Sequence, residues 1–464
     1  MLRPQPMPDY FAEDALLPEG WARGVRIRVS KGGVIDSVAV DQSSDGAARL
    51  PGPVIPGMVN VHSHAFQRAM AGLAERASPA GDNFWSWREV MYGFAARITP
   101  DDLHAIAAQL FVELLRHGYT SVGEFHYLHN QRGGAPYETP AEMSIQVIEA
   151  ARHMGITITH LPVIYAFGGF GEQTLEGVQT RFRADPAHAL SIAADLTARY
   201  RDDSRVKVGL APHSLRAVNL AMLHEAHSGV ADLDTAAPLH IHIAEQAKEV
   251  DHCLAWSGQR PIQWLCENLP VDERWCLIHA THAREDELES VAASGAAVGL
   301  CPTTEANLGD GLFGLAAFAA ANGRIAIGSD SNVSVSPVEE LRWLEYGQRL
   351  AAQRRNVFTT ADSPSAGTSL WRAAAEGGAK ALAQPAGAIA AGRRADLVVL
   401  DANNPNLAAK TGDQILDAFI FSGNDNAVDC VMVAGKWIIE DGCHAEEERT
   451  AANFRKVLRK LAEE

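Results

Sequence analysis

A His-x-His segment is the first sign of chemistry in the sequence. His62 and His64 end an apolar run that begins at residue 56. Side chains at positions i and i+2 of an extended segment point to the same side, so both imidazoles could reach one metal ion. Imidazole is a common ligand of zinc. The spacing alone also fits two unrelated histidines on a loop.

Three further apolar runs end in residues that bind metals or carry protons. His242 and Glu245 could place a ligand beside a carboxylate acid or base, although Glu245 could also cap the helix that it begins. His279 ends the next run, and Asp330 follows a later one, where it could be a helix N-cap. Each alternative is reasonable alone. Ligand-type residues at four separate run ends favour one shared site.

These runs belong to a regular alternation of short apolar strands and amphipathic helices. Eight strands with intervening helices over roughly 330 residues indicate a (β/α)8 barrel with insertions, whose active site lies at the carboxyl ends of the strands. The longest insertion, residues 65–100, is rich in aromatic residues and follows the first strand. The predicted strands cover residues 59–62, 121–125, 156–164, 206–211, 239–244, 276–279, 297–301 and 325–328.

Both ends of the chain contain short alternating strands separated by turns. Residues 25–40 and 430–439 show this pattern. We therefore predict that residues 1–55 and 386–464 form one composite β-sandwich domain, and that residues 56–385 form the barrel.

The formal net charge of −17 restricts the possible partners. It argues against nucleic acid or an anionic membrane surface as the main partner. An anionic substrate would need local arginines to overcome the field of the whole chain. No apolar stretch reaches the roughly 18 residues of a membrane span, and the chain starts without an apolar targeting segment. The six cysteines form no CxxC pair, so we expect a reducing cytoplasm.

Several motifs together resemble the amidohydrolase superfamily, in its deaminase branch. The similarity covers nearly the whole chain, because the final motif resembles the β-domain of that family. The motifs are residues 56–64, 242–245, 329–331 and 388–400, with His279 between the second and the third.

The resemblance implies the roles of the site residues. Four side chains are implied to bind one metal ion, usually zinc: His62, His64, His242 and Asp330. Glu245 and His279 are implied to assist proton transfer. His240 competes with His242 for the ligand role, but His242 stands three residues before Glu245, as the HxxE pattern of the family requires.

One metal ion is favoured over two. Binuclear members of the superfamily generally bridge their ions with a carboxylated lysine, or a glutamate, at the end of strand four. Here that strand ends at residues 210–213, and Lys207 lies inside it, three residues before Leu210. We therefore expect one divalent ion per subunit and expect it to be zinc.

Such a shell suits hydrolysis of a C=N bond. Water activated by the ion would attack the carbon while Asp330 accepts a proton and His279 holds the attacking oxygen. Glu245 would then hand a proton to the substrate nitrogen, and ammonia would leave.

Arg216, after strand four, suggests a carboxylate substrate gripped by a guanidinium, although it could be a surface arginine of the next helix. Here the sequence resembles the formimidoylglutamate deiminase family, which releases ammonia from N-formimino-L-glutamate in histidine degradation. The resemblance implies that four side chains bind the amino-acid end of the substrate: Gln67, Tyr127, His213 and Arg216. The matching segments are residues 62–68, 123–129, 211–216 and 336–348.

Arg88 lies in the long aromatic insertion, and arginine and aromatic residues are enriched at protein interfaces. We expect a homodimer in which Arg88 reaches the distal carboxylate of the partner's substrate. The alternative is a segment that covers its own site, with Arg88 paired locally with Glu89 or Asp82.

Two other functions stay open. One is a related enzyme, either a deaminase of guanine-like or nucleoside substrates or a chlorohydrolase. The other is a non-catalytic barrel, which loss of metal ligands would mark, and none of the four is lost in this sequence.

Overall fold

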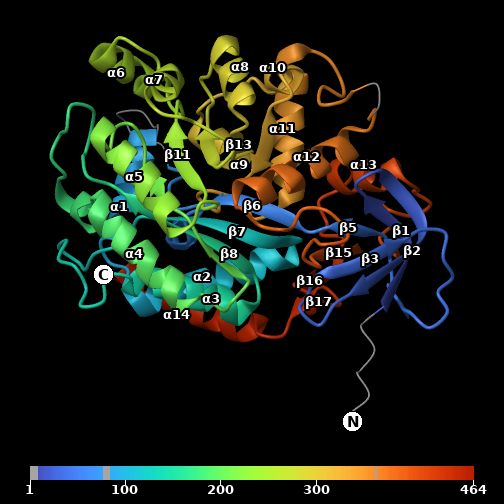
Figure 1. Cartoon of the computed structure of the whole chain (residues 1–464). Helices are drawn as coiled ribbons and strands as arrows, with labels where there is room; N and C mark the ends of the chain where they lie inside the picture. The colour runs from blue at the N-terminus through green and yellow to red at the C-terminus, as the bar shows by residue number, and fades with distance from the viewer. Residues whose placement is uncertain (1–8, 77–83, 361–362, 464) are drawn as a thin grey trace.

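Parallel strands form a barrel in the computed structural model, which describes residues 9–76, 84–360 and 363–463 (Figure 1). The strand order is β10-β8-β7-β6-β14-β13-β12-β11. Bridges from Leu210 to Leu239 and from Ser214 to His242 close the ring between β10 and β11. The strands are β6 (Met58–Ser63), β7 (Tyr119–His126), β8 (Thr157–Ile164), β9 (Val206–Val208), β10 (Ala211–Pro212), β11 (Leu239–Ile243), β12 (Trp275–His279), β13 (Ala297–Leu300) and β14 (Arg324–Ile327).

The predicted barrel is confirmed, with one difference in its fourth strand. That strand is interrupted between Val208 and Ala211, so that β9 and β10 each pair with β8. The backbone N–H groups of Gly209 and Leu210 still donate to neighbouring strands, at His160 and Pro238. The barrel therefore closes without a continuous fourth strand.

Helices surround the barrel and follow the amphipathic stretches between the strands. The sequence sets their ends locally: Thr99 caps α2, where its hydroxyl accepts from the backbone N–H of Asp102, and Pro100 occupies the first turn. The helices are α1 (Phe84–Ala95), α2 (Pro100–Arg116), α3 (Glu142–Met154), α4 (Pro186–Arg199), α5 (Leu220–Leu233), α6 (Ala247–Ser257), α7 (Pro261–Asn268), α8 (Glu285–Ser294), α9 (Pro302–Leu308), α10 (Leu315–Ala320), α11 (Pro337–Ala352) and α12 (Ala366–Ala381).

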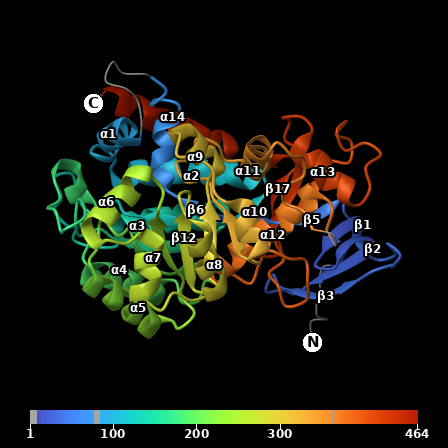
Figure 2. The ribbon, with the colours of Figure 1, turned by 90° about the horizontal axis from the view of Figure 1, so that it is seen from above.

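The two chain ends share a second sheet beside the barrel (Figure 2). Its two halves join where β5 pairs antiparallel with β15. A separate apolar core, which includes Val25, Ile27 and Met432, lies against it. The strands are β1 (Asp9–Leu17), β2 (Gly20–Val29), β3 (Ile35–Ala39), β4 (Ala48–Arg49), β5 (Val54–Pro56), β15 (Leu397–Leu400), β16 (Val428–Val433), β17 (Lys436–Glu440) and β18 (Cys443–His444).

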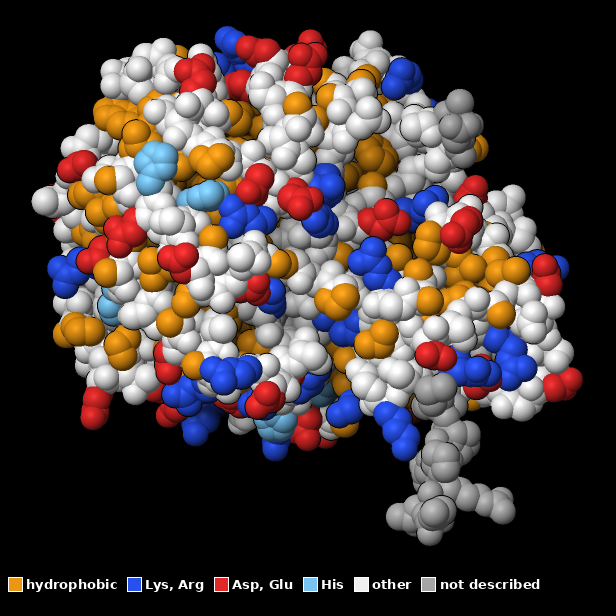
Figure 3. All heavy atoms as spheres, in the orientation of Figure 1, with side chains coloured by type: hydrophobic (Ala, Val, Ile, Leu, Met, Phe, Trp, Pro, Cys, Tyr) orange, Lys and Arg blue, Asp and Glu red, His pale blue; other side chains and the backbone are white. Residues whose placement is uncertain are grey.

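The C-terminal helix α14 (Glu447–Glu463) returns to the barrel and lies along α2 (Figure 1). Lys460 Nζ lies 2.7 Å from Asp102 Oδ2, and Arg116 Nη1 lies 2.6 Å from Glu447 Oε1. The space-filling view shows acidic and basic side chains interspersed over the face drawn (Figure 3). In the part of the chain that the structure describes, no helix has the length and apolar character needed to cross a membrane.

A buried ion pair links the second sheet to the barrel. Arg394 donates from Nε and Nη2 to Asp396, at 2.7–3.1 Å. The same guanidinium donates to Gln384 Oε1 and to Ser121 Oγ of β7, both at 2.6 Å. Both charged side chains are buried, so each depends on the other to offset its desolvation.

We predict that Arg394→Met destabilises the protein by about 3–5 kcal/mol, because Asp396 would keep a buried charge without its partner. Urea denaturation followed by circular dichroism measures the change. Arg393→Met is the matched control, since its neighbouring side chain is exposed and the effect should stay within about 0.5 kcal/mol. Equal midpoints for both variants would contradict the assigned role.

Candidate metal centre and active site

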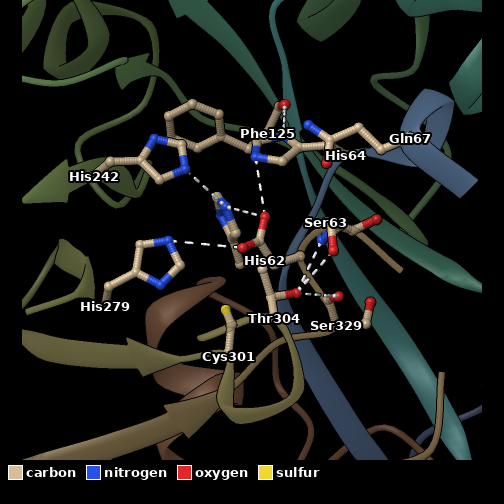
Figure 4. Close-up of polar contacts among 12 residues, drawn as sticks. His62, Ser63, His64, Gln67, Phe125, His242, His279, Cys301, Thr304 and Ser329 are labelled. Carbon is tan, nitrogen blue, oxygen red and sulfur yellow. Dashed lines mark hydrogen bonds and ion pairs between the residues drawn. The ribbon is translucent and has the colours of Figure 1, made fainter. Parts of the chain in front are cut away.

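Polar side chains from four strand ends meet at one mouth of the barrel (Figure 4). Each follows or ends its strand, so the parallel register brings them to the same end. All are nearly inaccessible to solvent. They are His62 and His64 from β6, His242 from β11, His279 from β12 and Asp330 from the segment after β14.

Backbone carbonyls orient two of the imidazoles. His64 Nδ1 lies 2.9 Å from the carbonyl oxygen of Phe125, and His242 Nδ1 lies 3.0 Å from that of His213. A carbonyl oxygen can only accept, so each Nδ1 carries the proton and each Nε2 presents a lone pair to the centre. This is the arrangement in which histidine binds a metal ion.

Burial also keeps these imidazoles neutral. It lowers the pKa of His64 to about 3. Burial, followed by the neighbouring histidines, lowers the pKa of His62 and of His242 well below the usual range. Neutral imidazole is the ligand form, because a protonated nitrogen has no lone pair to donate.

The ligand atoms have the spacing of a metal site. His62 Nε2 lies 3.0 Å from His242 Nε2 and 3.6 Å from Asp330 Oδ1, and His64 Nε2 lies 3.3 Å from the same oxygen. Bonds of about 2.0–2.1 Å in a tetrahedral shell put ligand atoms about 3.3 Å apart. The three histidines form one candidate metal cluster, and Asp330 Oδ1 lies beside two of them. Asp330 also forms a second candidate cluster with His279 and Cys301.

His240 lies deeper in the barrel than its competitor. Its Nε2 bonds the carbonyl oxygen of Ala381 at 2.9 Å, and it does not belong to the cluster of His62, His64 and His242. Lys207 is not placed to bind a metal ion either, because its Nζ pairs with Asp234.

Strained backbone and a polar network hold Asp330 at the centre. Asp330 and His279 adopt φ of 46° and 69°, a left-handed conformation that is costly for residues with a Cβ and persists where surrounding bonds enforce it. The backbone N–H of Asp330 donates to His62, and its carbonyl oxygen accepts from the N–H of His64. Asn60 and Asn332 bond Ser329 from both sides.

Three ionisable groups, Asp330, His279 and Glu245, lie close together at the centre. Burial raises the pKa of Asp330 to about 7. Burial alone would lower the pKa of His279, but the nearby carboxylates, first Glu245, raise it to about 10. His279 Nε2 lies 3.7 Å from Asp330 Oδ2 and 4.0 Å from Glu245 Oε1. The imidazole therefore lies between the carboxyl groups of Asp330 and Glu245, whose negative charge favours its protonated form.

A narrow cavity of 60 Å³ opens onto this centre. Gln67 Nε2 donates to the Tyr127 hydroxyl at 2.7 Å, while Gln67 Oε1 is buried without a partner among the described residues. The residues that the sequence predicted for substrate binding all line the cavity: Gln67, Arg88, Tyr127, His213 and Arg216.

Both arginines present unsatisfied donors to the cavity. The Nε atoms of Arg88 and Arg216 are buried and have no hydrogen-bond partner in the part of the chain that the structure describes. Burial alone would lower the pKa of Arg216, but Glu249 and other acidic neighbours raise it. Buried donors without partners are costly, so an anionic ligand would satisfy them.

Arg88 lies in the cavity of its own chain, on α1, and its guanidinium stacks on Trp85 and Tyr92 at 4.4 and 5.3 Å. The placement favours a segment that covers its own site over the expected reach into a partner. Of the two local partners that the sequence offered, Glu89 is exposed, and Asp82 lies outside the described residues.

Family profiles match almost the whole chain. The profile described as the amidohydrolase family matches residues 54–438, and that of the N-terminal domain of formimidoylglutamate deiminase HutF matches residues 9–52. The chain belongs to the amidohydrolase family. The resemblance predicted from the motifs is therefore confirmed.

Individual amidohydrolases show how close the similarity is. Formimidoylglutamate deiminase from Pseudomonas aeruginosa is 53% identical over 97% of this chain and 99% of its own. A 5-methylthioadenosine/S-adenosylhomocysteine deaminase from Natronomonas pharaonis is 30% identical, over 88% of this chain and 85% of its own. The crystal structure of an amidohydrolase from Brucella melitensis has a TM-score of 0.92 and 44% identity, and covers 98% of this chain and 100% of its own.

Two acidic residues near the site, Glu305 and Asp310, were not predicted from the sequence. Glu305 contacts His279, and Asp310 accepts from the Gln246 side chain, next to Glu245. Both follow the seventh strand, whose end is at the same barrel mouth as the others. Their position after that strand could have indicated a place near the site, but no motif of metal ligands accompanies them in the sequence.

We predict that His242→Asn abolishes retention of a divalent metal, because it removes a lone pair from the cluster. The matched control is His240→Asn, which changes the same residue type two positions earlier on the same strand and should leave metal retention intact. Metal analysis after dialysis, with circular dichroism to verify folding, measures both. Loss of metal from the His240 variant alone would reverse the assignment.

Proposed function

We propose that this amidohydrolase hydrolyses N-formimino-L-glutamate to N-formyl-L-glutamate and ammonia. The observation that carries the proposal is the pair of guanidiniums, Arg88 and Arg216, facing the ligand cluster across one narrow cavity. Two cations suit the two carboxylates of this substrate. The similarity to the Pseudomonas deiminase supports the same substrate.

The proposal includes one divalent ion, zinc, at this centre. The ligands would be His62, His64, His242 and Asp330, and the segment at Ala211–Pro212 supplies no carboxylate or lysine to bridge a second ion. When bound, the ion supplies a Lewis acid that activates water for attack.

The proton transfers follow from the three ionisable groups. Asp330 accepts a proton from the attacking water, because its carboxylate lies beside the ligand cluster. His279 Nε2 donates a hydrogen bond to the attacking oxygen. Glu245 donates a proton to the terminal nitrogen, and Asp330 passes a second proton to the same nitrogen. The bond between the formimino carbon and that nitrogen then breaks, ammonia leaves, and the new hydroxyl becomes the carbonyl as it returns a proton to Glu245.

Each arginine is proposed to bind one end of the substrate. Arg216 lines the cavity with His213, Gln67 and Tyr127, and these four would bind the amino-acid end. Arg88, on α1, would bind the distal carboxylate. A purine offers neither carboxylate, so it would leave both buried Nε donors unsatisfied.

Product analysis is the direct test of the proposal. Ammonia and N-formyl-L-glutamate should form from N-formimino-L-glutamate, with little release of ammonia from guanine or adenosine. Glu245→Gln should retain its metal and lose turnover, because the carboxyl carries a proton and is not a ligand. Formamide and glutamate as products, or preferred turnover of a purine, would reject the assignment.

Two arginine variants test how the substrate is oriented. Arg216→Met should lower kcat/KM roughly 30- to several-thousand-fold, since an unpaired buried charge costs about 2–5 kcal/mol. Arg88→Met should lower kcat/KM similarly for N-formimino-L-glutamate but little for N-formiminoglycine, which lacks the distal carboxylate. Arg216→Met should impair both substrates. An Arg88 variant that is equally impaired with both would argue against the assigned ends.

The homodimer and the cytoplasmic location stay predictions from the sequence. With Arg88 acting in its own chain, mixing Arg88→Ala and His242→Asn chains should restore no activity, even in hybrids shown to form.

A further inference from the structure

Glu305 is a buried carboxylate at the barrel mouth that none of the roles above uses. It lies in α9, directly after β13. Only 5% of the residue is exposed. A carboxylate is buried at considerable cost unless hydrogen bonds compensate, so its partners indicate its purpose.

The carboxylate has one partner that anchors it and one that it orients. Glu305 Oε1 accepts from the backbone N–H of Cys301 at 2.9 Å. The same oxygen lies 3.2 Å from Nδ1 of His279. Cys301 follows β13, and β13 pairs with β12, which carries His279. The carboxylate is therefore attached to the barrel itself.

The two nitrogens of His279 face different groups. Nδ1 faces Glu305, whereas Nε2 faces Asp330 and Glu245. The positive φ of His279 and Ala280 fixes the backbone, but it leaves the ring free to rotate about its own bonds. Fixing Nδ1 therefore also aims Nε2.

Few other contacts could hold the ring in this direction. Among residues 9–76, 84–360 and 363–463, Glu305 is the one hydrogen-bond partner of the imidazole. Its other contacts are longer: Nε2 lies 3.7 Å from Asp330 Oδ2 and 4.0 Å from Glu245 Oε1, and the ring stacks on His242, with centroids 5.6 Å apart and planes at 21°. Stacking fixes the plane of the ring, but it does not distinguish the two nitrogens from each other.

We infer that Glu305 is a positioning residue for the reaction: it accepts from His279 Nδ1 and so directs Nε2 at the attacking oxygen. The inference rests on the proposed function, in which His279 donates to that oxygen. Glu305 lines neither the substrate cavity nor the ligand cluster, so substrate affinity and metal content do not depend on it.

Three substitutions of Glu305 separate its hydrogen bond from its bulk. Glu305→Leu removes the acceptor and should lower kcat about 10- to 100-fold, the effect typical of such supporting partners, with KM and metal content unchanged. Glu305→Gln keeps an acceptor oxygen and should recover most of the loss. Glu305→Asp withdraws the carboxylate by one methylene and should lower kcat like Leu, which keeps the test informative if Glu305→Leu does not fold.

Glu340→Gln is the matched control. Glu340 is a second buried glutamate, which holds the start of α9 by accepting from the backbone N–H and the hydroxyl of Thr303, at 2.9 and 2.5 Å. Its substitution should lower the melting temperature and leave kcat unchanged. A loss of kcat in this variant equal to that of Glu305→Leu would assign the effect to α9 as a whole and overturn the inference.

Crystal structures of the variants give a readout that is independent of turnover. The His279 ring should keep its direction in the Gln variant and rotate in the Leu and Asp variants. If the wild-type enzyme releases no ammonia from N-formimino-L-glutamate, the proposed function fails while this structural test of Glu305 still stands. An unchanged ring together with an unchanged kcat in both the Leu and Asp variants would overturn the inference.

Discussion

The burial of ionisable side chains at one barrel mouth is the constraint on which this structure depends. Three imidazoles and a carboxylate lie within a few ångströms of one another and nearly out of reach of water. They tolerate this only if the imidazoles stay neutral and a cation balances the carboxylate. Burial enforces the first condition, as the low pKa of His64 shows. The proposed divalent ion would meet the second, and so would the protonated His279 beside Asp330.

The cavity beside this centre also contains buried charged groups, but here they are the positive guanidiniums of two arginines. The chain carries a net charge of −17, and its overall field opposes an anionic substrate. In the proposed function, Arg88 and Arg216 overcome this field locally, because both line one narrow cavity in which charges interact more strongly than in water. Their buried Nε atoms have no partners among the described residues, so the free protein carries an unsatisfied cost that an anionic ligand relieves. Recognition is therefore built from local geometry, against the charge of the whole molecule.

A further set of hydrogen bonds and ion pairs positions the side chains of the proposed site. Carbonyl oxygens of Phe125 and His213 set the tautomers of two ligands. Glu305 holds His279, and the Arg394–Asp396 pair ties the second sheet to β7 of the barrel. Each of these contacts joins elements far apart in the chain. These contacts fix the site residues relative to the strands of the barrel. Such a surrounding structure can hold a strained residue such as Asp330 in place.

The sequence by itself determined the barrel, the shared sheet of the chain ends and the set of ligand-type residues at the carboxyl ends of the strands. Strand periodicity and ligand-type residues at run ends are local patterns, and the carboxyl ends of parallel strands must meet. Only the tertiary structure decided the rest. It showed why His240, which the sequence already ranked behind His242, does not join the cluster, since its Nε2 bonds the carbonyl oxygen of Ala381. It also placed Arg88 at the cavity of its own chain. It also revealed Glu305, which no motif marked. These outcomes depend on contacts between residues distant in sequence, and the side chain that meets a partner is set by strand register and helix packing, which local patterns do not encode.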